Sequence, residues 1–399
     1  MKCQYCGTNP VPHKIEWYIK SLDIAMAPLR RAIVYSRPGI LLQKTGDAIS
    51  SGLLSGMEKL GAVKYNTDFS KLKVNRAKVL WEEAVARGWS IKEIKPLGLM
   101  MDAYKARIPA TGSAAARDIT FFGLPRQENY GNSALDWADD KWLFKKALIK
   151  AGLPAAPGKS VWNYNQALKV FKALRKPVII KPRMGSRGRH TTTYIYTEAE
   201  FKQAYRIAKQ LCYWVIVEEH LEGPVWRGTV VDGKCVGMLG GDPPKITGDG
   251  KSTIEQLIAG ANANKHPEVK DILINKKMHE FLARRGGMTI KTVLPAGQLL
   301  YLNEKIGVNY GGSSFEAYED THPDILKMFE DAAALINDPI LGFDFICEDI
   351  SKSWRDQRCG IIECNALPFI NLHHDPLHGK PRNVAKYVWD YVQATFPRP

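Results

Sequence analysis

The spacing of hydrophobic residues changes along the chain, from three- and four-residue intervals to short apolar runs. The first spacing indicates amphipathic helices and the second indicates buried strands. Near the N-terminus, the run at 32–35 predicts a strand, and residues 76–86 predict an amphipathic helix that ends at Gly88. The run at 119–122 predicts another buried strand. Strands that alternate with helices in this way predict a small α/β domain over residues 1–130.

Residues 131–230 change from helices to strands. Apolar positions predict one helix from about 139 to 150, which Gly152 ends, and another at about 163–175. The strands expected after them lie at 178–181, 191–196, 213–218 and 228–231. Asp232-Gly233, between two apolar runs, predicts a hairpin turn.

Residues 231–399 complete the pattern. A mostly polar stretch at about 245–300 predicts a helical insertion, and Thr321-His-Pro-Asp predicts the start of a further helix. The elements expected after it are strands at 342–346 and 360–365 and a helix at about 383–394. Together with the middle region, they predict mixed, largely antiparallel sheets covered by helices.

Composition places the chain among ordinary globular proteins. Its 399 residues are 45% hydrophobic and 24% charged, without a low-complexity tract or an internal repeat, which argues against disorder and solenoid architectures. A chain of this length predicts two or three domains. The N-terminus lacks the apolar core of a signal peptide, and no apolar run is long enough to span a membrane. We therefore expect a cytoplasmic protein with no membrane partner.

The chain carries a formal charge of +15, which attracts polyanions such as nucleic acid, acidic polymers or nucleotide phosphates. Its lysines and arginines are spread along the chain instead of forming a block of five or six. Charge of this kind is a statement about partners and specifies little by itself. Nucleic-acid binding as the main role is therefore disfavoured.

The seven cysteines do not suggest a disulfide framework. Five of them lie singly in or beside apolar runs, as reduced core thiols do. The other two form Cys3-x-x-Cys6, which is half of a zinc-binding pattern. No second pair of this kind follows, and His13 is the only nearby further ligand. A basic nucleic-acid-binding protein with an N-terminal zinc site stays open as an alternative.

The last two predicted strands carry a set of oxygen ligands. Side chains alternate along a strand, so Glu363 and Asn365 point to the same face of 360–365. Asp344 stands between two phenylalanines in the preceding strand. Buried carboxylates are costly unless they are paired or bind a metal. Two carboxylates and an amide oxygen suit Mg²⁺, which completes its coordination with phosphate and water, so we expect these three residues to be metal ligands.

A glycine-containing loop follows another predicted strand. Lys181 ends the apolar run at 178–181, and Gly185 and Gly188 lie in the loop after it. Glycine lets backbone N–H groups approach phosphate oxygens, and a lysine adds a positive charge. The segment is not a Walker loop, because a strand and not a helix follows it. Alone it is more often an ordinary turn, just as Lys141 alone is an ordinary solvated helix residue.

Taken in order, these motifs resemble the ATP-grasp superfamily over residues 135–397. The order is Asp-Lys141 before a helix, Lys181 before the glycine loop, Glu218-Glu-x-Leu-x-Gly, Gly-x-Asp344, and Ile-Ile-Glu363-x-Asn-x-x-Pro. Three further segments are similar to the ATP-grasp module of cyanophycin synthetase and of bifunctional glutathione synthetases: 243–258, 309–314 and 321–324. Residues 1–115 carry no motif that can be assigned.

The resemblance implies an α+β / α/β architecture with an ATP-grasp fold. Two α+β subdomains, 131–230 and 231–399, would grip ATP, and 1–130 would be a small α/β pre-ATP-grasp domain. The implied activity is that of an ATP-dependent, ADP-forming carbon–nitrogen ligase, which joins a carboxylate to an amine through an acyl phosphate. The implied cofactors are ATP and Mg²⁺, with Mn²⁺ as a substitute, and the expected substrate is an amino acid or a peptide. An ATP-grasp phosphotransferase that forms no amide stays open.

The resemblance also assigns roles to residues of this sequence. It implies that Arg227 and Lys181 are catalytic, with Arg227 steadying the transferred phosphoryl group or the acyl phosphate and Lys181 holding the ATP phosphates. It implies that Asp344, Glu363 and Asn365 hold the metal. The residues expected to bind ATP are Lys141, Lys181, Gly185, Ser186, Arg187 and Gly188 at the phosphates, and Glu218, Glu219 and Leu221 at the adenine.

Two positions depart from the family pattern. Val225 stands where relatives place an acidic residue for the ribose, and Gly241 stands where they often carry an arginine. The ribose and the substrate carboxylate must then be held by other groups. The sequence stops at Pro399, before the second half found in cyanophycin synthetase, so we expect a single ligation. Relatives of this kind often form dimers or tetramers, which makes a homodimer or homotetramer the expected assembly.

Overall fold

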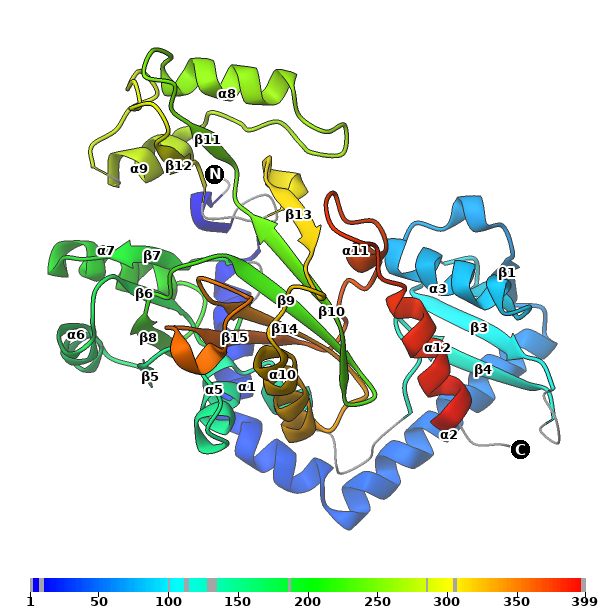
Figure 1. Cartoon of the computed structure of the whole chain (residues 1–399). Helices are drawn as coiled ribbons and strands as arrows, with labels where there is room; N and C mark the ends of the chain where they lie inside the picture. The colour runs from blue at the N-terminus through cyan, green and yellow to red at the C-terminus, as the bar shows by residue number, and fades with distance from the viewer. Residues whose placement is uncertain are drawn as a thin grey trace.

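The protein folds into several antiparallel sheets with covering helices (Figure 1). The computed structural model describes residues 3–6, 11–99, 101–110, 115–127, 135–185, 188–284, 286–303 and 307–395. Neighbouring strands in the sheets run antiparallel. The predicted mixed architecture with largely antiparallel sheets is therefore confirmed.

Two long helices follow a short turn near the N-terminus. The elements are η1 (Gln4–Cys6), α1 (His13–Val34) and α2 (Arg37–Lys59). The strand predicted at 32–35 is wrong, because this run forms the end of α1. Ile33 continues the three- and four-residue spacing of Met26 and Leu29. That helical spacing outweighs the local preference of a β-branched run for strands.

The N-terminal sheet has the order β1-β2-β3-β4. Its elements are β1 (Val63–Asn66), η2 (Phe69–Lys71), α3 (Asn75–Ala86), β2 (Ser90–Pro96), β3 (Ala103–Ile108) and β4 (Arg117–Phe122). The predicted helix at 76–86 is α3, and the strand predicted at 119–122 is β4. Only one face of β4 is buried, because Phe122 is exposed.

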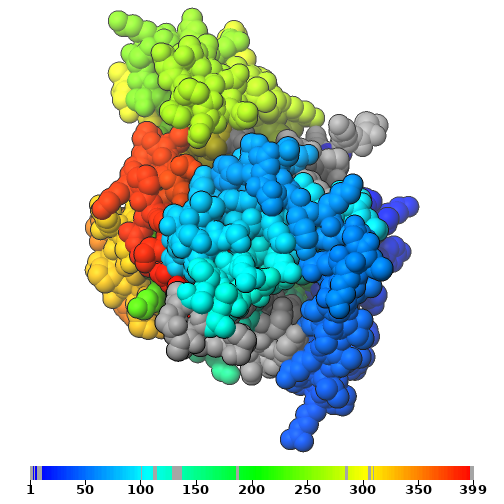
Figure 2. Space-filling model, turned by 90° about the vertical axis from the view of Figure 1, so that its right-hand side faces the viewer, coloured from blue at the N-terminus to red at the C-terminus, as the bar shows by residue number. Residues whose placement is uncertain are grey.

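The C-terminal helix α12 (Val384–Thr395) packs on this N-terminal unit. The indole N–H of Trp389 donates to the Leu80 carbonyl of α3 at 2.8 Å, and both residues are fully buried. Figure 2 shows the C-terminal segment in red beside the cyan sheet unit. Two segments from opposite ends of the sequence therefore share one core.

A second sheet has the order β5-β8-β6-β7. Its strands are β5 (Gly158–Val161), β6 (Val178–Pro182), β7 (Thr192–Ile195) and β8 (Val215–Glu219). Helices α6 (Tyr164–Ala173) and α7 (Glu198–Lys209) pack on this sheet, whereas α4 (Leu135–Ala138) and α5 (Lys141–Lys150) add their buried residues to the core of the third sheet. The rings of Phe171 and Phe201 stack at 4.5 Å and join α6 to α7 in the core. The helices predicted at 139–150 and 163–175 are thus present as α5 and α6.

The third sheet has the order β13-β10-β9-β14-β15. Its elements are β9 (Val225–Val231), β10 (Lys234–Asp242), β13 (Ser313–Glu316), α10 (Pro323–Ile336), β14 (Ile340–Ile346) and β15 (Gly360–Asn365). The predicted hairpin turn joins β9 to β10, and Asp232 and Gly233 have φ values of +49° and +73°, as a two-residue turn of this kind requires. Phe329 of α10 packs between Phe343 and Phe345 and covers one face of this sheet.

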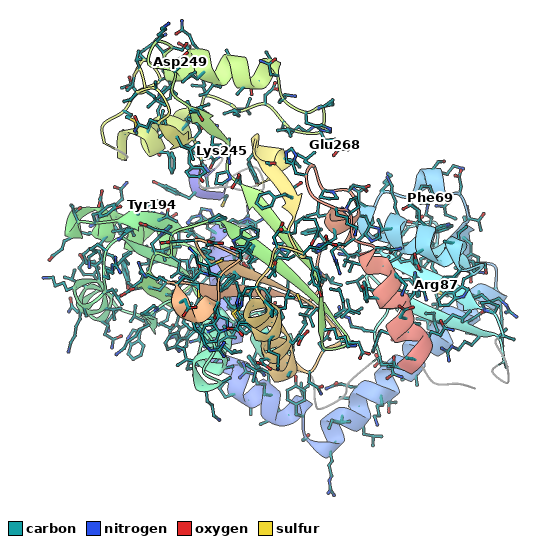
Figure 3. All side chains as sticks on the ribbon, viewed as in Figure 1. Phe69, Arg87, Tyr194, Lys245, Asp249 and Glu268 are labelled. Carbon is teal, nitrogen blue, oxygen red and sulfur yellow. The ribbon has the colours of Figure 1, made fainter. Side chains whose placement is uncertain are left out.

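The insertion projects from the rest of the molecule at the top of Figure 1. It contains β11 (Lys245–Thr247), α8 (Ile254–Ala263), α9 (Lys276–Arg284) and β12 (Leu299–Tyr301). Figure 3 marks it by Lys245, Asp249 and Glu268. The insertion has a hydrophobic cluster of its own. The remaining short elements are η3 (Val308–Tyr310), η4 (Trp354–Asp356) and α11 (Asn371–His374).

Helix α1 carries an apolar stripe on its exposed side. The stripe consists of exposed residues at alternating intervals of four and three: Ile15, Ile19, Leu22, Met26, Leu29 and Ile33. Such a repeat on a helix surface is typical of helices that pair with another helix. Within the described residues, no helix combines the length and the apolar character needed to cross a lipid bilayer.

Candidate active site

Helix α5 carries two lysines that contact residues of the second and third sheets. The helix begins at Lys141, because the Asp140 carboxylate caps it by accepting two backbone N–H bonds. Lys141 and Lys145 are four residues apart and therefore share a face of the helix. The Lys141 ammonium donates to the Gly185 carbonyl at 2.6 Å and lies 3.6 Å from a Glu363 oxygen. It thus joins the glycine loop of one sheet to the last strand of the other.

Glu218 is buried between two lysines. Its position on β8 is opposite Ile179 of β6, so Glu218 and Lys181 point to the same face of the sheet. One carboxylate oxygen lies 2.5 Å from the Lys181 ammonium, and the other accepts from Lys145, which also donates to the Ala156 carbonyl. Burial alone would raise the pKa of Glu218, but the two ammonium groups lower it to about 2. We call these three side chains the lysine–glutamate cluster.

The segment expected at the adenine continues beyond Glu218. Glu219 accepts from Arg358 at 2.6 Å and from the backbone N–H of Arg175 at 3.2 Å. Leu221 is buried, and a Cβ added at Gly360 would lie 3.0 Å from its side chain. The end of β8 is thus held against the start of β15, at the junction of the two sheets. The roles of Glu218, Glu219 and Leu221 toward adenine stay predictions.

Four polar side chains come together on one face of the third sheet. Asp344 of β14 is opposite Glu363 of β15 and opposite Arg227 of β9, while Asn365 is opposite Gly342, two positions from Asp344. Cross-strand partners and positions two apart share a face. The structure therefore brings Asp344, Glu363 and Asn365 together, as the strand alternation predicts. We call these three residues with Arg227 the acidic face.

Arg227 binds Asp344 in a two-point ion pair, with N···O distances of 2.7 and 3.0 Å. Burial would lower the pKa of Arg227, but Asp344 and then Glu363 raise it above its ordinary value. The guanidinium is therefore a permanent cation at the metal ligands expected from the sequence. This pairing was not predicted, because the two residues are 117 positions apart.

The acidic face also holds a polar atom without a partner. The side-chain nitrogen of Asn365 is buried and makes no hydrogen bond with the residues that the structure describes. Amide nitrogen and oxygen are assigned by their hydrogen bonds, so an unpartnered position can equally present the oxygen. Two carboxylates and one amide oxygen are hard donors of the kind that Mg²⁺ prefers. The residues present therefore fit a divalent cation.

The glycine loop is attached to the N-terminus of α5. Gly185 and Gly188 have φ values of +142° and +61°, which favour glycine, whereas Ser186 and Arg187 lie outside the described residues. Arg183, at the start of the loop, makes a two-point ion pair with the Asp140 carboxylate at 2.7 and 2.8 Å. The base of the loop is thereby fixed to the helix that carries Lys141.

Sequence reasoning missed three residues that organise this region. Lys145, Asp140 and Arg183 are all buried or nearly so, and each bonds to a partner far away in the sequence. The signal for Lys145 was its position one helical turn after Lys141, on the side that also carries the buried Phe144 and Leu148. A lysine beside an apolar stripe is usually solvated, so the signal was weak.

A buried hydrogen-bonded chain lies next to the acidic face. Thr229 is two positions from Arg227 on β9, and its hydroxyl lies 2.7 Å from His373 Nε2, while His373 Nδ1 lies 2.5 Å from Glu316. His373 is 1% exposed, and a Cβ at Gly237 would come within 2.6 Å of its ring. This chain ties α11 to β9 and β13 and so supports the strand that carries Arg227.

The two departures from the family pattern meet at one place on the sheet. Val225 and Gly241 are direct cross-strand partners between β9 and β10, and Val225 also faces Ile346 on β14. Neither position offers a side-chain polar group. Any contact to the ribose or to the substrate carboxylate at this point must use the backbone or neighbouring residues.

Comparison with known proteins finds relatives of this chain by sequence. No family model matches the chain. It is 32% identical over 271 residues to cyanophycin synthetase of Synechocystis sp., which covers 66% of this chain and 31% of that protein. It is 23% identical over 366 residues to the glutathione biosynthesis bifunctional protein of Clostridium perfringens, covering 87% of this chain and 46% of the relative.

The fold agrees with that of a solved relative. A bifunctional glutathione synthetase from Pasteurella multocida superposes with a TM-score of 0.54 at 20% identity, over 80% of this chain and 44% of that one. The chain is therefore similar to ATP-grasp ligases, as its motifs indicate, and the ATP-grasp fold expected from them is confirmed. It spans less than half the length of these relatives.

Proposed function

We propose that this protein is an ATP-dependent carboxylate–amine ligase that forms an amide or peptide bond through an acyl phosphate, with release of ADP and phosphate. The observation that carries the proposal is the acidic face, where Asp344, Glu363 and Asn365 lie together beside Arg227. Lys141 links this face to the glycine loop. The printed names of the relatives, cyanophycin synthetase and glutathione biosynthesis protein, support ligase chemistry on amino acids or peptides.

Asp344, Glu363 and Asn365 would hold Mg²⁺, or Mn²⁺ in its place. The bound cation would neutralise charge on the ATP phosphates. Arg227 would orient Asp344 toward the same point, since the two-point pair fixes the carboxylate plane. The unpartnered amide of Asn365 would find its partner there.

Lys141 and Lys181 would position ATP on the side of the site opposite the acidic face. Lys141 and Lys181 carry positive charge at the loop Gly185–Gly188, whose backbone N–H groups would contact the phosphates. Glu218 holds Lys181 in place, because the buried ion pair fixes its ammonium. The segment 218–221 would meet the adenine at the junction of the two sheets.

A carboxylate substrate would bind beside Arg227 of β9, next to the ATP phosphates. The free carboxylate resists attack by an amine because it is charged and lacks a leaving group. Phosphorylation by ATP removes the charge from the carboxylate and provides phosphate as the leaving group. The acyl phosphate would hydrolyse in water, so the glycine loop and the insertion 245–300 would serve as cover during the reaction. The basic surface, with a formal charge of +15, favours an acidic amino acid or peptide.

Three wider expectations stay proposals with partial support. The domain limits 1–130, 131–230 and 231–399 correspond to the three main sheets, except that β9 of the middle segment belongs to the third sheet and α12 packs with the first. The exposed stripe of α1 supports a homodimer or homotetramer. All seven cysteines are free thiols, which supports a reducing compartment such as the cytoplasm.

The proposal is tested by incubating the protein with ATP, Mg²⁺, hydroxylamine and pools of amino acids or acidic peptides. A ligase should release ADP and form a hydroxamate, because hydroxylamine traps an acyl phosphate. ADP with a phosphorylated metabolite and no hydroxamate would indicate a phosphotransferase. Tight ATP binding without stimulation by any pool would count against the ligase. The matched control is Asp344→Asn, which should form no hydroxamate.

A further inference from the structure

Two cysteines and two histidines converge at a point outside the candidate active site. The ligand atoms of Cys3, Cys6, His13 and His190 all lie within 4.8 Å of one another. Cys6 Sγ is 3.1 Å from His13 Nε2 and 3.5 Å from His190 Nε2, and Cys3 Sγ is 3.5 Å from the same His190 nitrogen. Three of these residues come from the N-terminal segment, and the fourth follows the glycine loop.

These distances suit a tetrahedral metal. With Zn–S of about 2.3 Å and Zn–N of about 2.0 Å, neighbouring ligand atoms lie roughly 3.3–3.8 Å apart. Cys₂His₂ is a common set for structural zinc, and four protein ligands leave no open position for chemistry. Neither cysteine is in a disulfide, so both sulfur atoms can act as ligands.

The orientation of His190 also suits a ligand. Its Nδ1 lies 2.8 Å from the Ile207 carbonyl, so Nδ1 carries the hydrogen and Nε2 presents its lone pair to both thiols. The His190 backbone N–H donates to the Tyr5 carbonyl at 3.1 Å, which fixes the loop to the N-terminal turn. His190 is 1% exposed and has a φ of +54°, a conformation that costs free energy in a residue other than glycine.

We propose that Cys3, Cys6, His13 and His190 bind one structural Zn²⁺. The pattern Cys-x-x-Cys with a nearby histidine supplies three ligands, and folding brings the fourth from 187 positions beyond Cys3. The sequence could not complete the set, because no local spacing marks His190 as the partner. The site does not depend on the proposed ligase activity.

The zinc site would fasten the N-terminal segment to the glycine loop. Gly188 is two residues before His190, and a Cβ built on Gly185 would lie 3.5 Å from the Lys20 ammonium of α1. Along the same helix, the Ser21 hydroxyl accepts from the Tyr213 N–H at 3.0 Å. The metal would thus hold one end of the loop that is proposed to contact ATP, and so would position the loop without touching the substrate.

Metal content decides the proposal. Full-length protein purified without chelators or metal-affinity steps should contain about one zinc per chain by plasma mass spectrometry. Replacement of zinc by Co²⁺ should give the intense visible bands of tetrahedral cobalt and a thiolate-to-cobalt charge-transfer band. Zinc well below stoichiometry together with no such bands would overturn the proposal. So would a Cys3–Cys6 disulfide found by intact mass under non-reducing conditions.

Variants separate these ligands from other thiols. Cys6→Ser and His190→Ala should lose the zinc, whereas Cys359→Ser, at a half-buried free cysteine elsewhere, should keep it. Zinc retained in both Cys6→Ser and His190→Ala would overturn the assignment. If these variants do not fold, the cobalt spectrum of the wild-type protein still decides. Should the protein prove to be a ligase, His190→Ala should raise KM for ATP about tenfold more than it lowers kcat, since the residue positions the loop.

Discussion

The lysine–glutamate cluster and the acidic face use the same kinds of charged group in opposite ways. In the cluster, Glu218 is 3% exposed and both of its oxygens are paired with lysines. On the acidic face, Asp344 and Glu363 are half-buried, and the Asn365 amide has an atom without a partner among the described residues. The first region is closed by its own ion pairs. In the second, Arg227 binds both oxygens of Asp344, but the Asn365 amide still has an atom available to a ligand.

The difference shows that the degree of burial distinguishes charged residues that stabilise the fold from charged residues that bind a ligand. Removing one partner of a buried ion pair leaves an uncompensated charge, which costs about 3–5 kcal/mol. Half-exposed carboxylates tolerate the loss of a partner because water replaces it, so their value lies in what they bind. Changes in the cluster should therefore affect stability, and changes on the acidic face should affect chemistry.

The largest expected effect is that of Glu363→Gln on the acidic face. The change removes the negative charge of a proposed metal ligand while it keeps the shape of the side chain. We expect ADP release to fall by about 10³-fold, comparable to the loss of a preorganised electrostatic group at a reacting centre. The melting temperature should change little.

The matched control for Glu363→Gln is Glu348→Gln. Glu348 is an exposed carboxylate just beyond the end of β14. Its neutralisation should leave ADP release within about twofold of the wild-type rate. Equal losses in both variants would show that general charge, and not a metal site, explains the effect.

Lys145→Met and Lys181→Met should divide stability from chemistry within the cluster. Lys145 is the more enclosed of the two lysines, and its loss should lower the free energy of unfolding by about 3–5 kcal/mol. Lys181→Met should also destabilise, and in addition should lower ADP release by about 10²–10³-fold in the folded protein. Thermal melts and ADP assays separate the two, with the exposed Lys159→Met as control. Full activity in Lys181→Met would show that this lysine has no role in the proposed phosphate site.

Acid should reduce the stability that the lysine–glutamate cluster contributes, within a defined pH range. The pKa of Glu218 falls from an ordinary value of 4.5 to about 2 in the folded protein, mainly because Lys181 and Lys145 outweigh the effect of burial. A carboxyl with a depressed folded pKa stabilises fully above its unfolded value, and that stability is lost as pH falls from 4.5 toward 2. The loss is about 3 kcal/mol.

Denaturant titrations of wild-type protein and Glu218→Gln measure this loss. The variant should be less stable near neutral pH, and the difference between the two proteins should shrink as pH falls through this window. The other carboxylates are common to both proteins, so their titration cancels in the difference. A difference that stays constant with pH would contradict the depressed pKa of Glu218.

The smallest expected effect is that of Val225→Glu at the departure from the family pattern. A carboxylate there could accept hydrogen bonds from the ribose hydroxyls, so KM for ATP should fall by roughly three- to tenfold with little change in kcat. Val225→Gln offers a neutral control of similar size. An unchanged KM in both variants would mean that the ribose lies elsewhere.

Local periodicity explains which parts were predictable from sequence. The alternation of Glu363 and Asn365 on β15 placed both on one face, and the structure has them there with Asp344. The turn at Asp232-Gly233 was equally local. Each of these features needs only two or three neighbouring residues, so the chain itself carries the information.

Long-range partners could not be predicted. Glu218 is 73 positions from Lys145, and His190 is 184 positions from Cys6. Nothing in the local sequence distinguishes such residues from solvated ones. The strand predicted at 32–35 failed for a related reason, because four apolar residues fit both a strand and the end of a long helix, and the extent of α1 decides between them.

The central claim is that the reaction passes through an acyl phosphate, and the most direct test follows an oxygen atom from the carboxylate to the released phosphate. A carboxylate substrate found in the hydroxamate screen is labelled with ¹⁸O in both carboxylate oxygens and is incubated with ATP, Mg²⁺ and the amine. An acyl phosphate passes one carboxylate oxygen to phosphorus, so the released inorganic phosphate should carry one ¹⁸O for each amide formed. Unlabelled phosphate alongside amide formation would contradict the account.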